Sequence, residues 1–215
     1  MDGYRNTLAA QAPGMVGLSK ISVQSGTSHG GIVLADGSIA DVQIDLETLR
    51  ALGEAARTEY GLSGAVQHGA STLPDSAFHH FPRTETSEIH LATGFQNMLY
   101  DHLPAALRDE MYAWLTTNAA DERKPKDTDE QFFYKTRKKA LGPFKRQLWS
   151  LPADTTARLA AAYDAKFEFL FTQLAIGGTT AHVERYVHVS PLHRPAPSAD
   201  AAGITAAPDD PDAGE

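Results

Sequence analysis

The chain has 215 residues, contains no cysteine, and carries 19 Lys and Arg against 27 Asp and Glu, which gives a formal net charge of −8. Its length suits one domain or a domain with an appendage, and the lack of cysteine excludes disulfides, thiolate metal sites and thiol nucleophiles. The negative charge argues against nucleic acid as a partner. No stretch has the apolar length of a signal peptide or a membrane span, so we expect a cytoplasmic protein without a membrane partner.

Three short segments of the first half predict strands. After an amphipathic stretch at residues 1–12, apolar and β-branched residues mark strands at 21–24, 65–67 and 88–92. A hairpin is expected around Asp36-Gly37, because this pair suits the positive φ angles of a tight turn.

Helices are predicted between and after these strands. Asp45 is a good N-cap for a helix that runs to residue 60, and a short helical piece is expected from residue 74. Two more helices, at 95–103 and 104–115, should be separated at the proline between them. This alternation predicts an α/β protein with parallel strands, arranged as a barrel or as a doubly wound sheet.

The remainder of the chain predicts a helical region and an acidic tail. Thr128 and Gln131 fit a capping box for a helix through residue 149, which Gly142-Pro143 should kink or split. A further helix is expected at 153–176, before two glycines. From residue 190 onward Pro, Ala and Asp dominate, which predicts a disordered tail.

The ends of the three predicted strands hold the residues that suggest chemistry. Carboxyl ends of parallel strands converge on one face, and His29 and His68 each precede a glycine at such an end. Two imidazoles so placed suit a zinc ion at about 2.0–2.1 Å from each nitrogen, whereas each histidine alone also fits an ordinary loop residue. Gly69, Ser71 and Thr93 suit a phosphate cradle and equally fit turn chemistry.

Three motifs at these strand ends follow one another in a specific order. They are Gly26-Thr27-Ser28-His29-Gly30, the stretch from Ala65 to Asp75 that contains His68-Gly69-Ala70-Ser71-Thr72, and Glu88-Ile89-His90-Leu91-Ala92-Thr93. In order and spacing they resemble the last three strand ends of the class II, zinc-dependent fructose-bisphosphate aldolases. The resemblance covers residues 16–118, and the region 121–187 is similar to a helical extension found in a longer branch of that family.

The resemblance implies a fold and an activity. The fold is α/β, the C-terminal part of a TIM (β/α)8 barrel at residues 1–118, followed by a helical extension at 119–189 and the disordered tail at 190–215. The activity is that of a lyase in glycolysis and carbohydrate metabolism, which reversibly cleaves a ketose phosphate such as fructose 1,6-bisphosphate to dihydroxyacetone phosphate and an aldehyde. The full-length enzyme is then expected to be a homo-oligomer.

The resemblance also assigns roles to residues. His29 and His68 become ligands of zinc or of another divalent cation. The family commonly has asparagine at the position of His90 and an acidic or amide residue at that of Ala92, so His90 either replaces the asparagine as a hydrogen-bond donor or simply packs. The residues that the resemblance places at the substrate phosphate are Gly30, Gly69, Ser71, His90 and Thr93.

Much of the family's active site is not matched. Three of the eight expected barrel strands are found, and a complete barrel typically needs about 250 residues. The family's remaining zinc histidine, its carboxylate proton donor and its mobile-loop glutamate belong to earlier strands. We therefore expect a truncated sequence that begins at an internal methionine and is inactive alone.

The segment 122–146 suggests a different function. It holds nine Lys and Arg against four acids, and its interleaved aromatic residues are Phe132, Phe133, Tyr134 and Phe144. This composition suits RNA or a protein partner, and thus a non-catalytic interaction module. It equally suits a helix that packs its aromatic side on the barrel and leaves a basic face in water.

Overall fold

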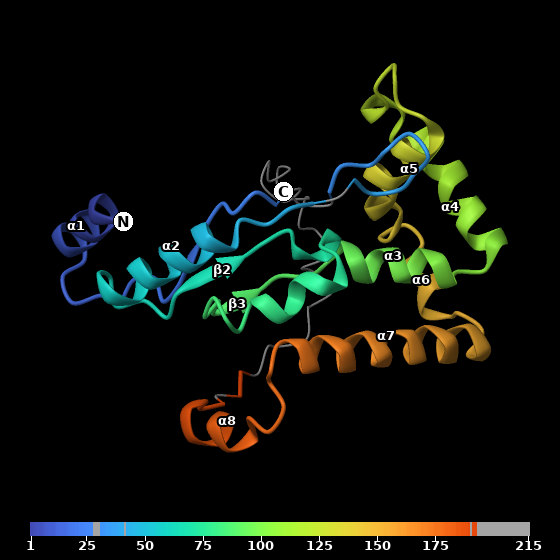
Figure 1. The fold of residues 1–215 in the computed structure, drawn as a ribbon. Helices are drawn as coiled ribbons and strands as arrows, with labels where there is room; N and C mark the ends of the chain where they lie inside the picture. The colour runs from blue at the N-terminus through green and yellow to red at the C-terminus, as the bar shows by residue number, and fades with distance from the viewer. Residues whose placement is uncertain (28–30, 41, 190, 193–215) are drawn as a thin grey trace. The chain divides into compact units, whose positions relative to one another are not determined.

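The computed structural model describes residues 1–27, 31–40, 42–189 and 191–192 (Figure 1). The chain divides into two units, Met1–Ala175 and Ile176–Glu215. The described residues are mostly helical and contain one small sheet. None of the helices in these ranges is long and apolar enough to cross a membrane.

Among the described residues, the three strands and most of the helices belong to the first unit. Its helices and strands are α1 (Asp2–Gln11), β1 (Ile21–Ser22), α2 (Leu46–Thr58), β2 (Ala65–Gln67), β3 (Glu88–Ile89), α3 (Thr93–His102), α4 (Ala105–Asn118), α5 (Asp129–Thr136), α6 (Lys145–Trp149) and α7 (Ala153–Gln173). Four 3₁₀ turns join them, η1 (Ala70–Thr72), η2 (Asp75–His80), η3 (Ala120–Glu122) and η4 (Arg137–Ala140). In the second unit, the described residues form α8 (Thr180–Tyr186).

The sheet has the order β1-β2-β3, and both pairs are parallel, as predicted. Ala65 pairs with Ile21, and Val66 pairs with Glu88. The central strand β2 is buried along its whole length. The outer strands are shorter than predicted, and the chain beyond each keeps a single backbone bond to β2, from Val23 N to Val66 O and from His90 N to Gln67 O. The predicted parallel strands are therefore present among the described residues, whereas the structure does not show a TIM barrel.

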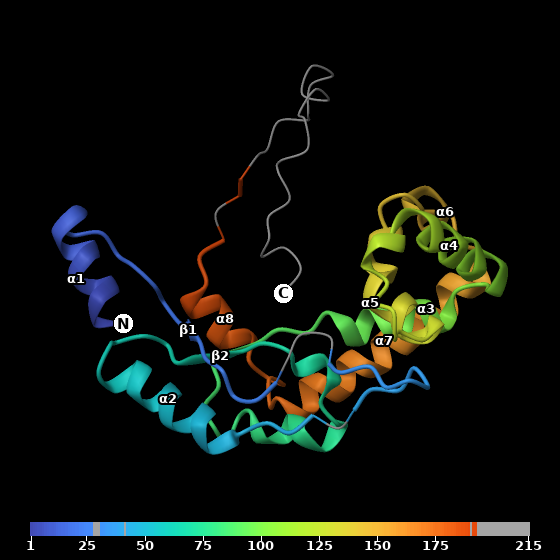
Figure 2. The same ribbon diagram turned by 90° about the horizontal axis from the view of Figure 1, so that it is seen from above.

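Helix α2 packs along β2 (Figure 2). Its predicted N-cap is confirmed, because the Asp45 carboxylate accepts a hydrogen bond from Thr48 N at 2.9 Å and so satisfies one of the open amides of the first turn. Leu49 and Ala56 are almost fully buried on the face toward Ala65. An amphipathic helix over a short apolar strand is the arrangement that a parallel α/β unit requires.

The predicted hairpin is confirmed as a tight turn with one antiparallel bridge, between Val33 and Ile39. Leu34 N donates to Ser38 O at 2.8 Å, and Gly37 has a φ of 83°. The left-handed conformation is the reason for glycine at this position.

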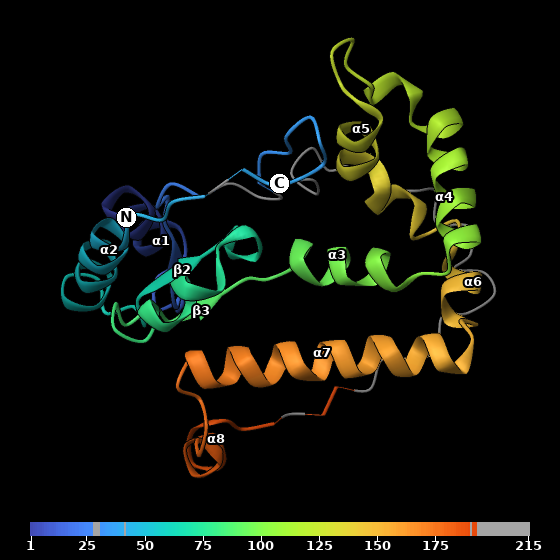
Figure 3. The same cartoon turned by 45° about the vertical axis from the view of Figure 1, so that its right-hand side comes forward.

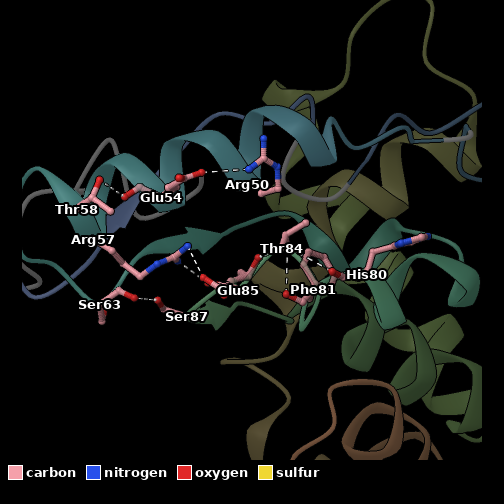
Figure 4. A network of polar contacts seen from close by, with 11 residues as sticks. Arg50, Glu54, Arg57, Thr58, Ser63, His80, Phe81, Thr84, Glu85 and Ser87 are labelled. Atoms are coloured by element: carbon pink, nitrogen blue, oxygen red, sulfur yellow. Dashed lines mark hydrogen bonds and ion pairs between the residues drawn. The ribbon is translucent and has the colours of Figure 1, made fainter.

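Polar contacts stabilise the turn that precedes β3, and Arg57 joins it to α2 (Figure 4). Arg57 Nη1 donates to Glu85 O at 3.0 Å and Nη2 pairs with the Glu85 carboxylate at 2.6 Å. Ser87 Oγ donates to Ser63 O at 2.6 Å, and Thr84 Oγ1 donates to Phe81 O at 3.1 Å. These contacts lie at the amino ends of the strands, where a parallel α/β fold carries stability rather than chemistry.

Two apolar clusters are present in the described residues, one next to the sheet and one farther along the chain. The latter lies among α4, α5 and the turn η4 (Figure 3). The predicted capping box at the start of α5 is present, with Thr128 and Gln131 exchanging hydrogen bonds. The predicted helix through residue 149 is interrupted, as expected, but the interruption begins earlier than predicted: α5 ends at Thr136, η4 follows, and the chain resumes as α6 after Pro143. The buried members of this cluster are Tyr100, Leu103, Met111, Leu115, Ala119, Phe132, Ala140 and Phe144.

Helix α7 packs against α3 and η2 within the first unit (Figure 3). Leu170 is buried in the apolar cluster next to the sheet, and Tyr163 Oη donates to Phe95 O at 3.0 Å. The helix ends at Gln173, before the predicted end at residue 176, because Ala175 adopts a left-handed conformation with a φ of 54°.

Candidate functional site

A buried polar network joins the loops that follow β1 and β2. Ser25 Oγ donates to Gln67 Oε1 at 2.5 Å, and Gln67 Nε2 donates to Thr27 Oγ1 at 2.7 Å. Thr27 Oγ1 in turn donates to His68 O at 2.8 Å. Buried polar groups are costly unless they are paired, and each of these side chains has its partner. The network therefore fixes the backbone at His68.

The loop after β1 meets the loop after β2 at a second point. Gly31 has a φ of 69°, and a Cβ added to it would lie 3.0 Å from Thr72 Cγ2. Only glycine allows so close an approach in this conformation. Thr27 and Gly31, the residues on either side of 28–30, thus both contact the segment from His68 to Thr72.

The loops after β2 and β3 are also joined. Ala92 N donates to Ser71 Oγ at 2.8 Å, and a Cβ added to Gly94 would lie 3.2 Å from Ser71 O. Helix α3 begins at Thr93, so its open amides lie beside this contact. Gly69 opens η1 with a φ of 68°. The structure brings together Gly69, Ser71 and Thr93, which the sequence placed at a phosphate.

The rings of His68 and His90 are in contact, with their centroids 4.2 Å apart. His90 Nε2 pairs with one oxygen of the Glu88 carboxylate, and Lys20 Nζ pairs with the other. The hydrogen bond from Lys20 is the main cause that lowers the pKa of Glu88, and the hydrogen bond with His90 lowers it further. The contact to Glu88 gives His90 a partner within the chain.

Sequence reasoning assigned no role to Gln67, Glu88 or Lys20. A glutamine in a strand that is otherwise apolar is a detectable signal for a buried network. Glu88 and His90 are two residues apart, which places them on one face of an extended segment. Lys20 and Glu88 meet across β2, and this pairing follows only from the strand order β1-β2-β3.

The chemistry of the donor set fits zinc in part. Imidazole nitrogens are zinc ligands, and a catalytic zinc site takes three protein ligands. His68 lies at the end of β2, whereas His29 and Gly30 lie outside the described residues. In the part of the chain that the structure describes, no group of three or more His, Asp or Glu is arranged to hold a metal ion. Of the two predicted ligands the structure places His68, and the described residues by themselves do not form a complete metal site.

The basic segment 122–146 buries much of its aromatic surface. Phe132 and Phe144 are almost fully buried, and the Phe133 ring stacks on Tyr112 with centroids 4.3 Å apart. Arg137 is also buried, with its guanidinium 4.4 Å from the centroid of the Tyr134 ring.

Several of the remaining cations in this segment have acidic partners. The ion pairs join Lys135 to Asp127, Arg123 to Asp129 and Lys139 to Glu122. This arrangement corresponds to a helical layer that packs its aromatic side and leaves a partly neutralised basic face.

Comparison with known proteins adds no assignment to this geometry. No family model matches the chain, and no curated protein matches it.

Proposed function

We propose that the chain provides the carboxyl-terminal part of a zinc-dependent aldolase barrel. The reaction is the reversible cleavage of a ketose phosphate, such as fructose 1,6-bisphosphate, to dihydroxyacetone phosphate and an aldehyde. One observation carries the proposal: three consecutive parallel strands end in loops that touch one another, through Thr27 with His68 and through Ser71 with Ala92. Active sites of parallel α/β folds lie at such strand ends.

The phosphate of the substrate is assigned to the contact between the last two loops. The amides at the start of α3 and the backbone at Gly69 offer N–H donors, and the hydroxyls of Ser71 and Thr93 add two more polar groups. Ser71 Oγ already accepts a hydrogen bond from Ala92 N, so its own proton is left to donate to a phosphate oxygen. Binding of this non-reacting group holds the reacting carbons in place.

His29 and His68 are the residues of this chain that would hold the metal. Zinc supplies a Lewis acid, which stabilises the negative charge that cleavage between C3 and C4 places on the substrate. The chain's own contribution is to position His68, whose carbonyl accepts hydrogen bonds from Thr27 and Gln67. Thr27 and Gly31, the described residues nearest to His29 in the sequence, both contact the same segment as His68.

Proton transfer requires groups that this chain does not match. The family's proton-donating carboxylate, its loop glutamate and its third zinc histidine belong to earlier strands of the barrel. Glu88 does not replace them in this proposal, because both of its carboxylate oxygens are engaged, with Lys20 and His90.

The test is an aldolase assay on the protein encoded by the longest reading frame that contains this chain. Release of triose phosphate from fructose 1,6-bisphosphate, and its loss on removal of zinc with a chelator, are expected. His68→Ala should abolish the activity, whereas His182→Ala, a change at an exposed histidine of α8, should leave it intact. Full activity in the His68→Ala protein would refute the assignment.

A further inference from the structure

A cavity lies next to the contact between the loops after β2 and β3, and Ser71 and Gly94 of that contact form part of its lining. It has a volume of about 250 Å³ and is enclosed by η1, η2, the start of α3 and the helix α7. Its walls are mostly apolar, formed by Leu73, Phe78, Leu91, Phe95, Met98 and Leu170. Drug-sized ligands occupy pockets of roughly 300 Å³ or more, so this cavity suits a smaller ligand group, such as one aromatic ring or one branched aliphatic side chain.

Two opposite charges also line this cavity. Lys166 Nζ on α7 pairs with Asp75 Oδ1 at the start of η2, at 2.6 Å. The ammonium lies 4.8 Å from the centroid of the Phe169 ring and 5.7 Å from that of Phe78, so aromatic faces hold it in place.

This ion pair is able to exchange partners. The Lys166 side chain is 31% exposed and the Asp75 side chain 64% exposed. Ion pairs in water at such exposure contribute little to stability, so a ligand that supplies both opposite charges replaces the pair at small cost. A ligand with a single charge leaves either the ammonium or the carboxylate without its partner.

We propose that this cavity binds a free amino acid with an apolar side chain. The carboxylate of the ligand pairs with Lys166, its ammonium pairs with Asp75, and its side chain fills the apolar space beside Leu91 and Met98. The amino acid is a zwitterion without net charge, and the Lys166–Asp75 pair that binds it also has no net charge. The cavity shares Ser71 with the residues proposed to bind the substrate phosphate, whereas Lys166 and Asp75, which pair with the charges of the amino acid, have no role in the proposed aldolase chemistry.

The proposal is tested by calorimetric titration of the full 215-residue chain. L-phenylalanine is compared with 3-phenylpropionate, which lacks the ammonium, and with 2-phenylethylamine, which lacks the carboxylate. Each ligand is titrated to about 10 mM, which detects a Kd of 1 mM. We expect phenylalanine to bind at least tenfold more tightly than either analogue, because each analogue loses one charge-assisted contact.

Two double variants separate the site from general effects. Asp75→Asn with Lys166→Met should weaken phenylalanine binding at least tenfold, since the methionine keeps the stem and removes the charge. Asp154→Asn with Arg158→Met removes an exposed ion pair from the same helix and should leave binding unchanged. Circular dichroism of each variant shows that it is folded. The proposal is overturned if phenylalanine does not bind, if either analogue binds equally well, if the Asp75→Asn, Lys166→Met chain binds like the parent chain, or if the control variant loses binding to the same extent.

Discussion

Replacement of Gln67 with leucine removes the side chain that links the loops after β1 and β2. Ser25 is 2% exposed, and its hydroxyl loses the acceptor Gln67 Oε1. A buried donor left without a partner costs about 1–3 kcal/mol. Thr27 Oγ1 keeps its own bond to His68 O but loses the bond from Gln67 Nε2. The loss of that hydrogen bond adds about 0.5–1.5 kcal/mol to the destabilisation. The free energy of unfolding should therefore fall by about 1.5–4.5 kcal/mol.

Urea denaturation followed by circular dichroism measures this change. With a slope of about 2 kcal/mol/M, the midpoint should fall by about 1–2 M at an unchanged slope. Adding Ser25→Ala to the Gln67→Leu chain should recover part of the loss, because both partners are then apolar. Gln147→Leu, at an exposed position of α6, is the matched control and should stay within about 0.5 kcal/mol of the parent. A Gln67→Leu midpoint equal to that of the control would refute the role of the network.

Three further predictions concern other parts of the fold. Thr128→Ala removes the capping box of α5 and should lower the free energy of unfolding by about 1 kcal/mol in the same urea assay; an unchanged midpoint would contradict the capping role. Ala175→Gly places glycine at a φ of 54° and should raise the stability by about 0.5–1 kcal/mol, seen as a higher Tm; a lower Tm would show that the conformation is not strained. The lowered pKa of Glu88, caused by Lys20, makes its contribution to stability present at neutral pH and lost as the pH falls through that pKa. The Tm of Glu88→Gln should thus lie below that of the parent at pH 7 and converge with it in acid, and a gap that is constant with pH would contradict this.

Local signals in the sequence predicted the elements that depend on local chemistry. Asp45 and Thr128 mark helix starts because their side chains satisfy amides three residues ahead. The hairpin follows from Gly37, whose φ of 83° few other residues adopt. The parallel order of the strands follows from the helix between the first two, since such a connection returns the chain in the same direction.

The features that were missed depend on contacts between distant segments. Ser25 and Gln67 are 42 residues apart and form a pair only when β1 and β2 align. Lys20 and Glu88 meet across the whole sheet, 68 residues apart. The end of α7 was misplaced because Ala175, rather than a glycine, takes the left-handed conformation that terminates the helix. Helix α8 carries no strong cap or periodicity that marks it in advance.

The central claim is that His29 and His68 bind one zinc ion. X-ray absorption at the zinc edge of the zinc-loaded chain tests this most directly, because it counts imidazole nitrogens around the metal. Nitrogen ligands are expected at about 2.0–2.1 Å, with one imidazole lost in His29→Ala and one lost in His68→Ala. A zinc spectrum and zinc content that are the same in the parent chain and in both variants would contradict it.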